Sequence, residues 1–130
     1  EFVAAALLDM VYHTLPEIKD IDVRQFEINA MKKAGLIDEI IPRYRSTYFS
    51  HVFSGGYSAG YYAYMWAEVL DSDAFQPFAE KGVFDKETAD SFRENILSKG
   101  NSDDAMTLYK KYRGAEPDPV YLLRNRGFVK

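Results

Sequence analysis

The sequence contains no cysteine and only two histidines, His13 and His51. A chain without thiols can form no disulfide, no thiolate nucleophile and no cysteine-ligated zinc site. It suits a reducing compartment, so we expect a cytoplasmic protein. The two histidines do not form the H-E-x-x-H motif, in which two imidazoles one helical turn apart bind zinc. We therefore expect this chain to supply no metal ligand.

Long apolar runs and an excess of positive charge are lacking as well. No stretch approaches the roughly 20 apolar residues of a membrane span, and no basic-then-apolar signal segment opens the chain. The net charge of −4 favours neither nucleic acid nor an anionic membrane as a partner. No Gly-Lys-Ser/Thr of a phosphate-binding loop follows the glycines, and no spacing selects a serine triad. The residues alone therefore reveal no reaction centre.

What the sequence does contain is typical of a globular helical protein. Its 130 residues are 47% hydrophobic and 28% charged, which is enough to bury a core in one domain. No segment alternates in the manner of a strand, so we predict a single all-α domain over residues 1–130. The first helix is expected to end before Pro16 and to bury an apolar stripe at three-to-four-residue spacing. That stripe comprises Ala4, Leu7, Leu8, Val11 and Leu15.

Capping residues and glycine stops predict further helices. One is expected between Asp22 and Gly35, one between Asp85 and Gly100, and one after a cap at Ser102. A short apolar helix is expected to follow the turn "EPDP" near the end. At the other end, the apolar pattern is already running at residue 2 without a capping side chain before it. We expect such a chain to be part of a longer one.

Aromatic residues reach 15% and cluster with glycine in "HVFSGGYSAGYYAYMW", residues 51–66. A helix over residues 58–70, continuing after a bend, would place Tyr57, Tyr61 and Tyr64 on one face at i, i+4 and i+7. A tyrosine hydroxyl is a neutral hydrogen-bond donor at pH 7. Such donors can stabilise a carbonyl oxygen that becomes negative during nucleophilic attack.

The remaining residues of the cluster leave two interpretations open. Gly55 and Gly56 let the backbone approach a ligand closely and adopt a positive φ, so that a flexible loop would precede the tyrosines. Tyr62 and Trp66 are expected to point into the core. The alternative interpretation is a tyrosine-rich core helix that follows an ordinary glycine turn, with no ligand.

The segment "RYRSTYFSHVFSGGYSAGYYAYMWAEVL" closely resembles the glycine-rich loop and following helix of the thimet oligopeptidase-like zinc metallopeptidases, and most closely their bacterial peptidyl-dipeptidase branch. The family pattern is a histidine, a short spacer, Gly-Gly-Tyr and then Tyr-Tyr-x-Tyr-x-Trp. Residues 5–13, "AALLDMVYH", and residues 95–117, "NILSKGNSDDAMTLYKKYRGAEP", extend the resemblance over essentially the whole chain. The pattern is met by His51, Gly55-Gly56-Tyr57 and Tyr61-Tyr62-Ala63-Tyr64-Met65-Trp66.

This resemblance implies the C-terminal, helical part of a larger zincin-type peptidase that hydrolyses short peptides and releases dipeptides from their C-termini. The family's H-E-x-x-H helix and third glutamate ligand have no counterpart here, so the zinc would be bound by the remaining N-terminal part of the peptidase. That part and short peptides are the expected partners, and the isolated chain is expected to be inactive.

The resemblance also implies roles for single residues. Tyr57 and Tyr64 would be catalytic, because they would hydrogen-bond the substrate carbonyl and the tetrahedral oxyanion. Four further residues would bind substrate: Tyr61 would line the cleft, His51 would contact the peptide or hold the loop, and Gly55 and Gly56 would hinge that loop.

A different class of function is a non-catalytic helical module whose glycine–tyrosine groove binds peptides. Finding H-E-x-x-H and a downstream glutamate in the sequence before Glu1 would favour the peptidase over this module. Arg43 and Arg45 precede the loop, and arginine binds carboxylates in a two-pronged geometry. These arginines could recognise the C-terminal carboxylate of a peptide, but surface ion pairing explains both of them and is the preferred interpretation. His13 is interpreted as an ordinary helix histidine.

Overall fold

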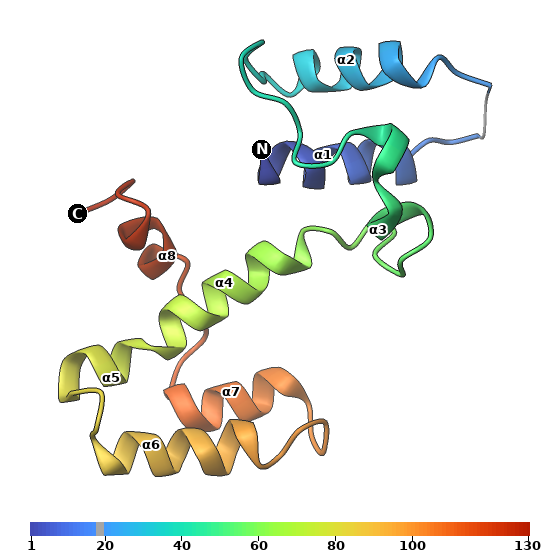
Figure 1. Cartoon of the computed structure of the whole chain (residues 1–130). Helices are drawn as coiled ribbons and strands as arrows, with labels where there is room; N and C mark the ends of the chain where they lie inside the picture. Colours follow the sequence, from blue (N-terminus) through green and yellow to red (C-terminus); the bar gives the residue numbers. More distant parts are fainter. Residues whose placement is uncertain (18–19) are drawn as a thin grey trace. The chain divides into compact units, whose positions relative to one another are not determined.

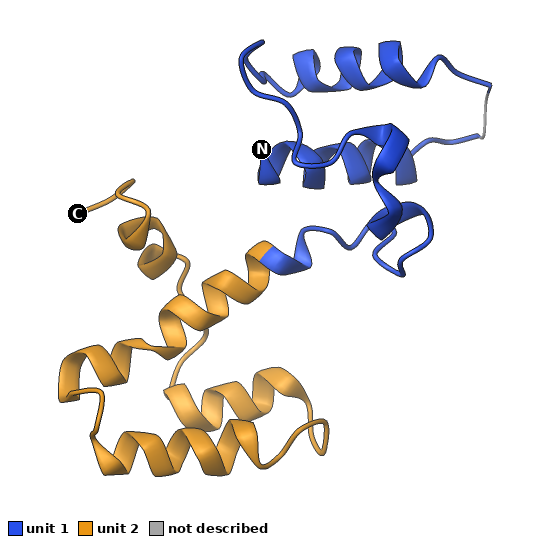
Figure 2. Ribbon diagram, viewed as in Figure 1, with its two compact units in different colours: residues 1–64 blue, residues 65–130 orange. Residues whose placement is uncertain are grey.

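A computed structural model describes residues 1–17 and 20–130 of the chain. The regular structure of these residues is entirely helical, which confirms the predicted all-α class. The chain divides into two compact units, residues 1–64 and residues 65–130 (Figure 2). The boundary falls inside a helix, and for this reason no change of composition marks it in the sequence. None of the helices described has both the length and the apolar character needed to cross a membrane.

Unit 1 is built on two longer helices that lie side by side, α1 (Phe2–His13) and α2 (Val23–Lys33) (Figure 1). A 3₁₀ turn, η1 (Ser46–Tyr48), and the short helix α3 (Ser50–Phe53) follow. The predicted cap of α2 is confirmed, because the Asp22 side chain accepts a hydrogen bond of 3.0 Å from the Gln25 amide. Such a cap satisfies one of the free N–H groups at a helix start.

The buried face of α1 differs from the predicted stripe. Ala4 and Leu8 are buried as expected, but Leu7 and Leu15 are exposed. Ala5 and Asp9 occupy the centre of the buried face instead. The small alanines let neighbouring segments approach the helix closely. Close packing, and not side-chain size alone, therefore determines which face of α1 is buried.

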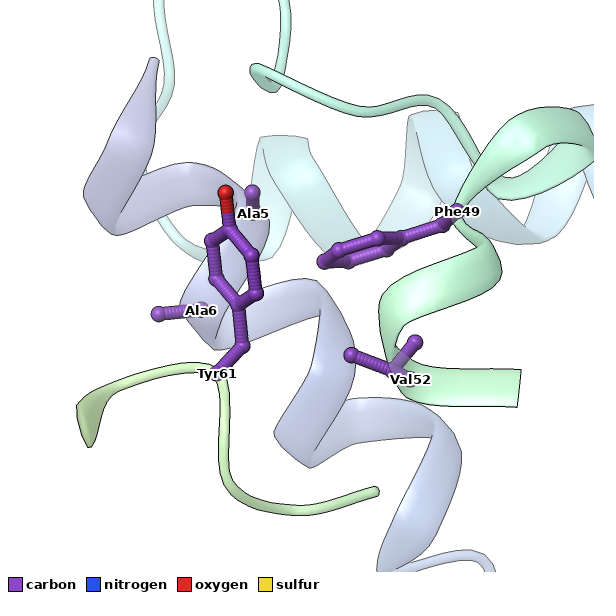
Figure 3. Packing of buried hydrophobic residues seen from close by; sticks show 5 residues of the cluster. All are labelled: Ala5, Ala6, Phe49, Val52 and Tyr61. Atoms are coloured by element: carbon purple, nitrogen blue, oxygen red, sulfur yellow. The ribbon is translucent and has the colours of Figure 1, made fainter. Parts of the chain in front are cut away.

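Two hydrophobic clusters form the core of unit 1. In the first, the Tyr61 ring meets the Phe49 ring edge-on, with centroids 4.9 Å apart, above the methyl groups of α1 (Figure 3). The second cluster joins α1 to α2 through Ala4, Leu8 and Met31. Edge-to-face contacts of this kind favour one arrangement of rings in addition to the burial of apolar area. The members of the first cluster are Ala5, Ala6, Phe49, Val52 and Tyr61.

A buried glutamate of α2 ties the helices to η1. The Glu27 carboxylate accepts hydrogen bonds from the Ser46 amide at 2.7 Å, from the Ser46 hydroxyl at 2.8 Å and from Arg45 Nε at 2.7 Å. The Tyr12 hydroxyl of α1 donates to the same Ser46 hydroxyl at 2.8 Å. Burial by itself raises the pKa of Glu27, but the bonds from Ser46 and Arg45 outweigh it and hold the pKa below its ordinary value of 4.5.

Unit 2 consists of most of α4 (Ala63–Ala74), followed by α5 (Gln76–Lys81), α6 (Lys86–Phe92), the π-helix η2 (Arg93–Leu97), α7 (Ala105–Arg113) and α8 (Val120–Asn125). The predicted bend after the tyrosine-rich helix and the predicted short last helix are both present. Asp85 caps α6 as expected, with 2.9 Å between its carboxylate and the Thr88 amide. The cap of α7 is Asp104, not Ser102, because Asp104 accepts from the Thr107 amide at 2.8 Å.

A buried aspartate, Asp73, organises the packing of unit 2. It accepts a short hydrogen bond from the Tyr109 hydroxyl and forms an ion pair with Arg113, with 3.2 Å between Nε and the carboxylate. The Tyr112 hydroxyl donates to the carbonyl of Ala74 at 2.7 Å. Three residues of α7 thus bind the end of α4, and Figure 1 shows α7 lying beside α6. Burial and the nearby Asp73 carboxylate raise the pKa of Tyr109, so its hydroxyl stays protonated.

The lowered pKa of Glu27 predicts acid sensitivity of unit 1. Because the folded pKa lies below the unfolded one, the stabilisation is fully present above about pH 4.5 and is lost as the pH falls through the lowered folded value. Glu27→Gln should therefore flatten the fall in unfolding free energy between about pH 5 and pH 3. Urea unfolding at a series of pH values measures this slope. The exposed Glu39→Gln is the matched control, and an unchanged slope in Glu27→Gln would contradict the prediction.

The cap of α7 gives a second prediction. Removing the acceptor in Asp104→Ala should cost about 1 kcal/mol of local stability, because the Thr107 amide loses its partner at the helix start. Hydrogen exchange of the first-turn amides of α7 measures the effect. Ser102→Ala removes the residue that the sequence favoured and should leave this exchange within about 0.3 kcal/mol of the wild type. Equal effects of the two substitutions would show that the cap is not Asp104.

Candidate functional site

The segment between α3 and α4, residues 54–62, is a series of turns that we call the Gly–Tyr loop. The sequence predicted a helix from about residue 58, but α4 begins only at Ala63. A left-handed residue within the predicted range explains the difference, namely Ala59 with φ +55°. A run of right-handed helix cannot pass through such a residue. Tyr57 and Tyr61 therefore precede the helix, and the argument that placed them on one helical face is wrong.

The Gly–Tyr loop is held at its start by bonds to α3. The Gly55 amide donates to the carbonyl of Ser50 at 2.7 Å, and the Tyr57 amide donates to the carbonyl of His51 at 2.9 Å. The Ser58 hydroxyl donates to the carbonyl of Val52 at 2.6 Å. These bonds turn the chain back over the end of α3, so the position of Tyr57 depends on α3.

The second half of the loop is bound by a residue that the sequence analysis did not select, Asp9 of α1. Its Oδ1 accepts from the Ala59 amide at 2.9 Å, and its Oδ2 accepts from the Tyr61 amide at 3.0 Å. Asp9 is completely buried. The imidazole Nδ1 of His13 lies 2.8 Å from Oδ1 and 2.9 Å from the Asp9 carbonyl. In the sequence, the sign of this role was an acidic residue on the apolar face of α1, followed by a histidine one helical turn later.

Tyr57 and Tyr64 remain together despite the late start of α4. Their rings stack with centroids 5.1 Å apart, and the side chains are 37% and 38% exposed, respectively. The Tyr57 hydroxyl, acting as a hydrogen-bond partner, and some burial raise the pKa of Tyr64 to about 12. Tyr64 therefore keeps its proton throughout the neutral range and can donate a hydrogen bond to an acceptor on a ligand.

Tyr61 differs from its two neighbours, because it is only 2% exposed. Its ring stacks on Phe2 with centroids 4.9 Å apart, and burial raises the pKa of its hydroxyl. The expectation that Tyr61 lines an open cleft is thus corrected, since this ring belongs to the core. Tyr62 and Trp66 show the reverse, because both were expected in the core and both are exposed.

His51 of α3 lies among aromatic rings next to the loop. Its centroid is 4.6 Å from that of Tyr44 and 6.2 Å from that of Tyr57. Its Nδ1 is buried and has no hydrogen-bond partner within the described part of the chain. Buried polar atoms are normally paired, so this nitrogen is available for a contact that the chain itself does not provide.

The two glycines of the loop are required for different reasons. Gly56 has φ +83°, a conformation that residues with a Cβ rarely adopt. A Cβ at Gly55 would lie 2.9 Å from His51 Cα and 3.0 Å from the His51 carbonyl oxygen, both of them backbone atoms that cannot move aside easily. Gly55 thus permits close packing of the loop on α3, and Gly56 permits the turn.

The two arginines before the loop occupy different surroundings. Arg45 is engaged by the buried Glu27, at 2.7 Å. Arg43 is exposed and its guanidinium lies 5.9 Å from the Tyr44 ring centroid. Ion pairing within the chain therefore accounts for Arg45, in agreement with the ion-pair interpretation of the sequence.

The described residues do not fit a zinc centre. No group of three or more histidine, cysteine, aspartate or glutamate side chains in this part of the chain is arranged to hold a metal ion. Asp9 and His13 are adjacent, but the Asp9 oxygens are already bound by backbone amides. No metal-dependent step is assigned to these residues.

The close approach of Gly55 to α3 gives a testable prediction. Gly55→Ala should loosen the Gly–Tyr loop, because the new methyl group would overlap the backbone of His51. Gly60→Ala is the matched control, because its Cβ would meet its nearest neighbour, the Tyr57 carbonyl oxygen, at an ordinary 3.4 Å. Hydrogen exchange at the Tyr57 amide, measured in the complete protein, should rise at least about tenfold in the first variant and little in the second. Equal protection in both would refute the packing role of Gly55.

Comparison with known proteins shows relatives along nearly the whole chain. Dipeptidyl carboxypeptidase of Escherichia coli is 46% identical over 129 residues, which are 98% of this chain and 19% of that protein. Oligopeptidase A of the same organism is 53% identical over 79 residues, which are 61% of this chain and 12% of that protein. Saccharolysin of Saccharomyces cerevisiae is 29% identical over 128 residues. The chain thus spans about a fifth or less of the length of these relatives.

These matches confirm the relationship that the loop motif predicted. The profile of Peptidase family M3 matches residues 1–128 and so includes α1, the Gly–Tyr loop and the helices of unit 2. Because the match covers almost every residue, the chain belongs to Peptidase family M3.

Proposed function

We propose that this chain is the C-terminal part of a zinc-dependent peptidase that cleaves short peptides and releases dipeptides from their C-termini. The identity to a dipeptidyl carboxypeptidase over 98% of the chain supports this choice of reaction. In this proposal the chain supplies hydrogen-bond donors for the substrate, and the rest of the peptidase supplies the zinc ligands. The protein is proposed to act in the cytoplasm, on short peptides and on neither nucleic acid nor membranes.

The observation that carries the proposal is the pair formed by Tyr57 and Tyr64. The two rings stack, and each side chain is more than a third exposed, so both hydroxyls can reach a ligand. Tyr64 is a neutral donor at working pH, as tyrosines ordinarily are, and its pKa is raised further, to about 12. Neutral donors held in advance at the point where negative charge develops lower the barrier to acyl transfer. We assign to these two residues the hydrogen bonds to the substrate carbonyl and to the tetrahedral oxyanion.

The remaining residues of the site are proposed to support this pair. His51 would offer its buried Nδ1 to the peptide or to the loop once substrate is bound. Gly55 and Gly56 would let the loop carrying Tyr57 close over the peptide. Tyr61, being buried, would act through packing under the loop and not by lining the cleft.

A single substitution tests the proposal in the complete peptidase. Tyr64→Phe removes one donor and keeps the ring, so kcat/KM for a short peptide should fall by about 10²–10³. Tyr62→Phe is the matched control, since Tyr62 lies two residues earlier, is 57% exposed and makes no ring contact with the cluster among the described residues. Its kcat/KM should stay within about threefold of the wild type. The same small effect in Tyr64→Phe would show that the assigned role is wrong.

A peptide-binding module without catalysis is distinguished by the same variants. In such a module Tyr64→Phe would weaken peptide binding, and the complete protein would show no turnover of the peptide. The comparison therefore requires both a binding and a turnover measurement on the complete protein.

A further inference from the structure

We propose that Asp9 is a positioning residue for the two tyrosine donors, because its buried carboxylate fixes the Gly–Tyr loop against α1. This inference rests on the proposed function, since it names the group that holds Tyr57 and Tyr64 in place. Asp9 touches neither hydroxyl. Its action would pass through the backbone of the loop.

The first step of the argument is the geometry of the clamp. One carboxylate oxygen accepts the amide of Ala59, and the other accepts the amide of Tyr61, at 2.9 Å and 3.0 Å. The first of these amides belongs to Ala59, which adopts φ +55°, so a left-handed turn lies between the two donors that bind the same carboxylate. Concave arrangements of backbone N–H groups of this kind bind anions. The carboxylate and the unusual backbone conformation therefore depend on each other.

The second step concerns the charge of Asp9. The two loop amides each need an acceptor, one on each carboxylate oxygen. A carboxylate supplies an acceptor on both oxygens, whereas a side-chain amide supplies only one. With Asp9 ionised, the contact with His13 requires the tautomer that carries a proton on Nδ1, since the Asp9 carbonyl also only accepts. Charge-assisted bonds of this type are stronger than neutral ones.

The third step connects the clamp to the donors. Tyr61, whose amide is bound by Asp9, contacts the ring of Tyr64 with centroids 5.3 Å apart. Tyr64 in turn stacks on Tyr57. The bound amides lie between the two donors in sequence, two to five residues from each. Freeing them would let the loop shift and would misplace both hydroxyls, and an error of about 1 Å in such a position can cost about 10²-fold in rate.

A buried acid can also be a structural element without any link to catalysis, and the experiment separates the two roles. In the complete peptidase, Asp9→Asn leaves one loop amide without an acceptor. We expect kcat to fall at least about tenfold while KM stays within about threefold. In a Tyr57→Phe/Tyr64→Phe background, where both donors are already lost, the same substitution should lower kcat by less than about threefold. Hydrogen exchange of the Ala59 and Tyr61 amides should rise in Asp9→Asn.

Glu27→Gln is the matched control. Glu27 is also buried in unit 1 and also accepts a backbone amide, that of Ser46, but it does not contact the Gly–Tyr loop. Its replacement should leave kcat within about threefold of the wild type, even where it lowers stability. An effect on kcat as large as that of Asp9→Asn would show that any buried acid of this unit matters equally and would overturn the inference.

Two further outcomes decide the matter. An equal fold-loss from Asp9→Asn in the wild-type and Tyr57→Phe/Tyr64→Phe backgrounds, or wild-type kcat in Asp9→Asn, overturns the positioning role. If Asp9→Asn does not fold, His13→Gln carries the test by the same cycle, because it removes the side-chain partner of the carboxylate at a partly exposed position. A loss of kcat that vanishes in the Tyr57→Phe/Tyr64→Phe background supports the inference, and any other result opposes it. Small effects of Tyr64→Phe alone would instead refute the proposed function.

Discussion

The structure of unit 1 depends on one buried carboxylate. Asp9 is fully enclosed, and an enclosed charge is tolerated only when hydrogen bonds replace the water that it has lost. Its replacements are amides of the Gly–Tyr loop, which lie 50 and 52 residues further along the chain. The burial of Asp9 on α1 and the order of the second half of the loop therefore depend on the same two hydrogen bonds.

The same contact explains how three tyrosines of one short motif receive different surroundings. Asp9 holds the amide of Tyr61 against α1, so the ring of this residue enters the core between Phe2 and Phe49. Tyr57, before the clamp, and Tyr64, after it, are left at the surface. The buried ring of Tyr61 contacts the ring of Tyr64, and Tyr57 stacks on Tyr64 in turn. The motif thus places the buried Tyr61 between two tyrosines, Tyr57 and Tyr64, whose side chains remain accessible.

Features set by local bonds could be predicted from the sequence, and features set by distant bonds could not. The caps at Asp22 and Asp85 join residues three apart, and both predictions were correct. Ser102 and Asp104 are both good capping residues two positions apart, so the sequence placed a cap here but did not decide between them, and the bond to the Thr107 amide identifies Asp104. The helix start near residue 58 was wrong because a left-handed Ala59 is stabilised by Asp9, far away in sequence. Residue type alone gives no reason to expect that conformation.

The choice of phenols also has a physical reason in the proposed reaction. A lysine or arginine at the position of Tyr64 would attract the developing oxyanion but would also bind the carboxylate of any free peptide end. A tyrosine hydroxyl carries no net charge, so it does not favour one uncharged or charged ground state strongly over another. Its hydrogen bond to the substrate strengthens only as negative charge develops on the carbonyl oxygen. Tyr64 is a neutral donor at neutral pH, as tyrosines ordinarily are, and its contact with Tyr57 raises its pKa further, to about 12. A donor of this kind needs exact placement to be useful, and the buried clamp of Asp9 on the adjoining backbone is the means by which unit 1 can provide it.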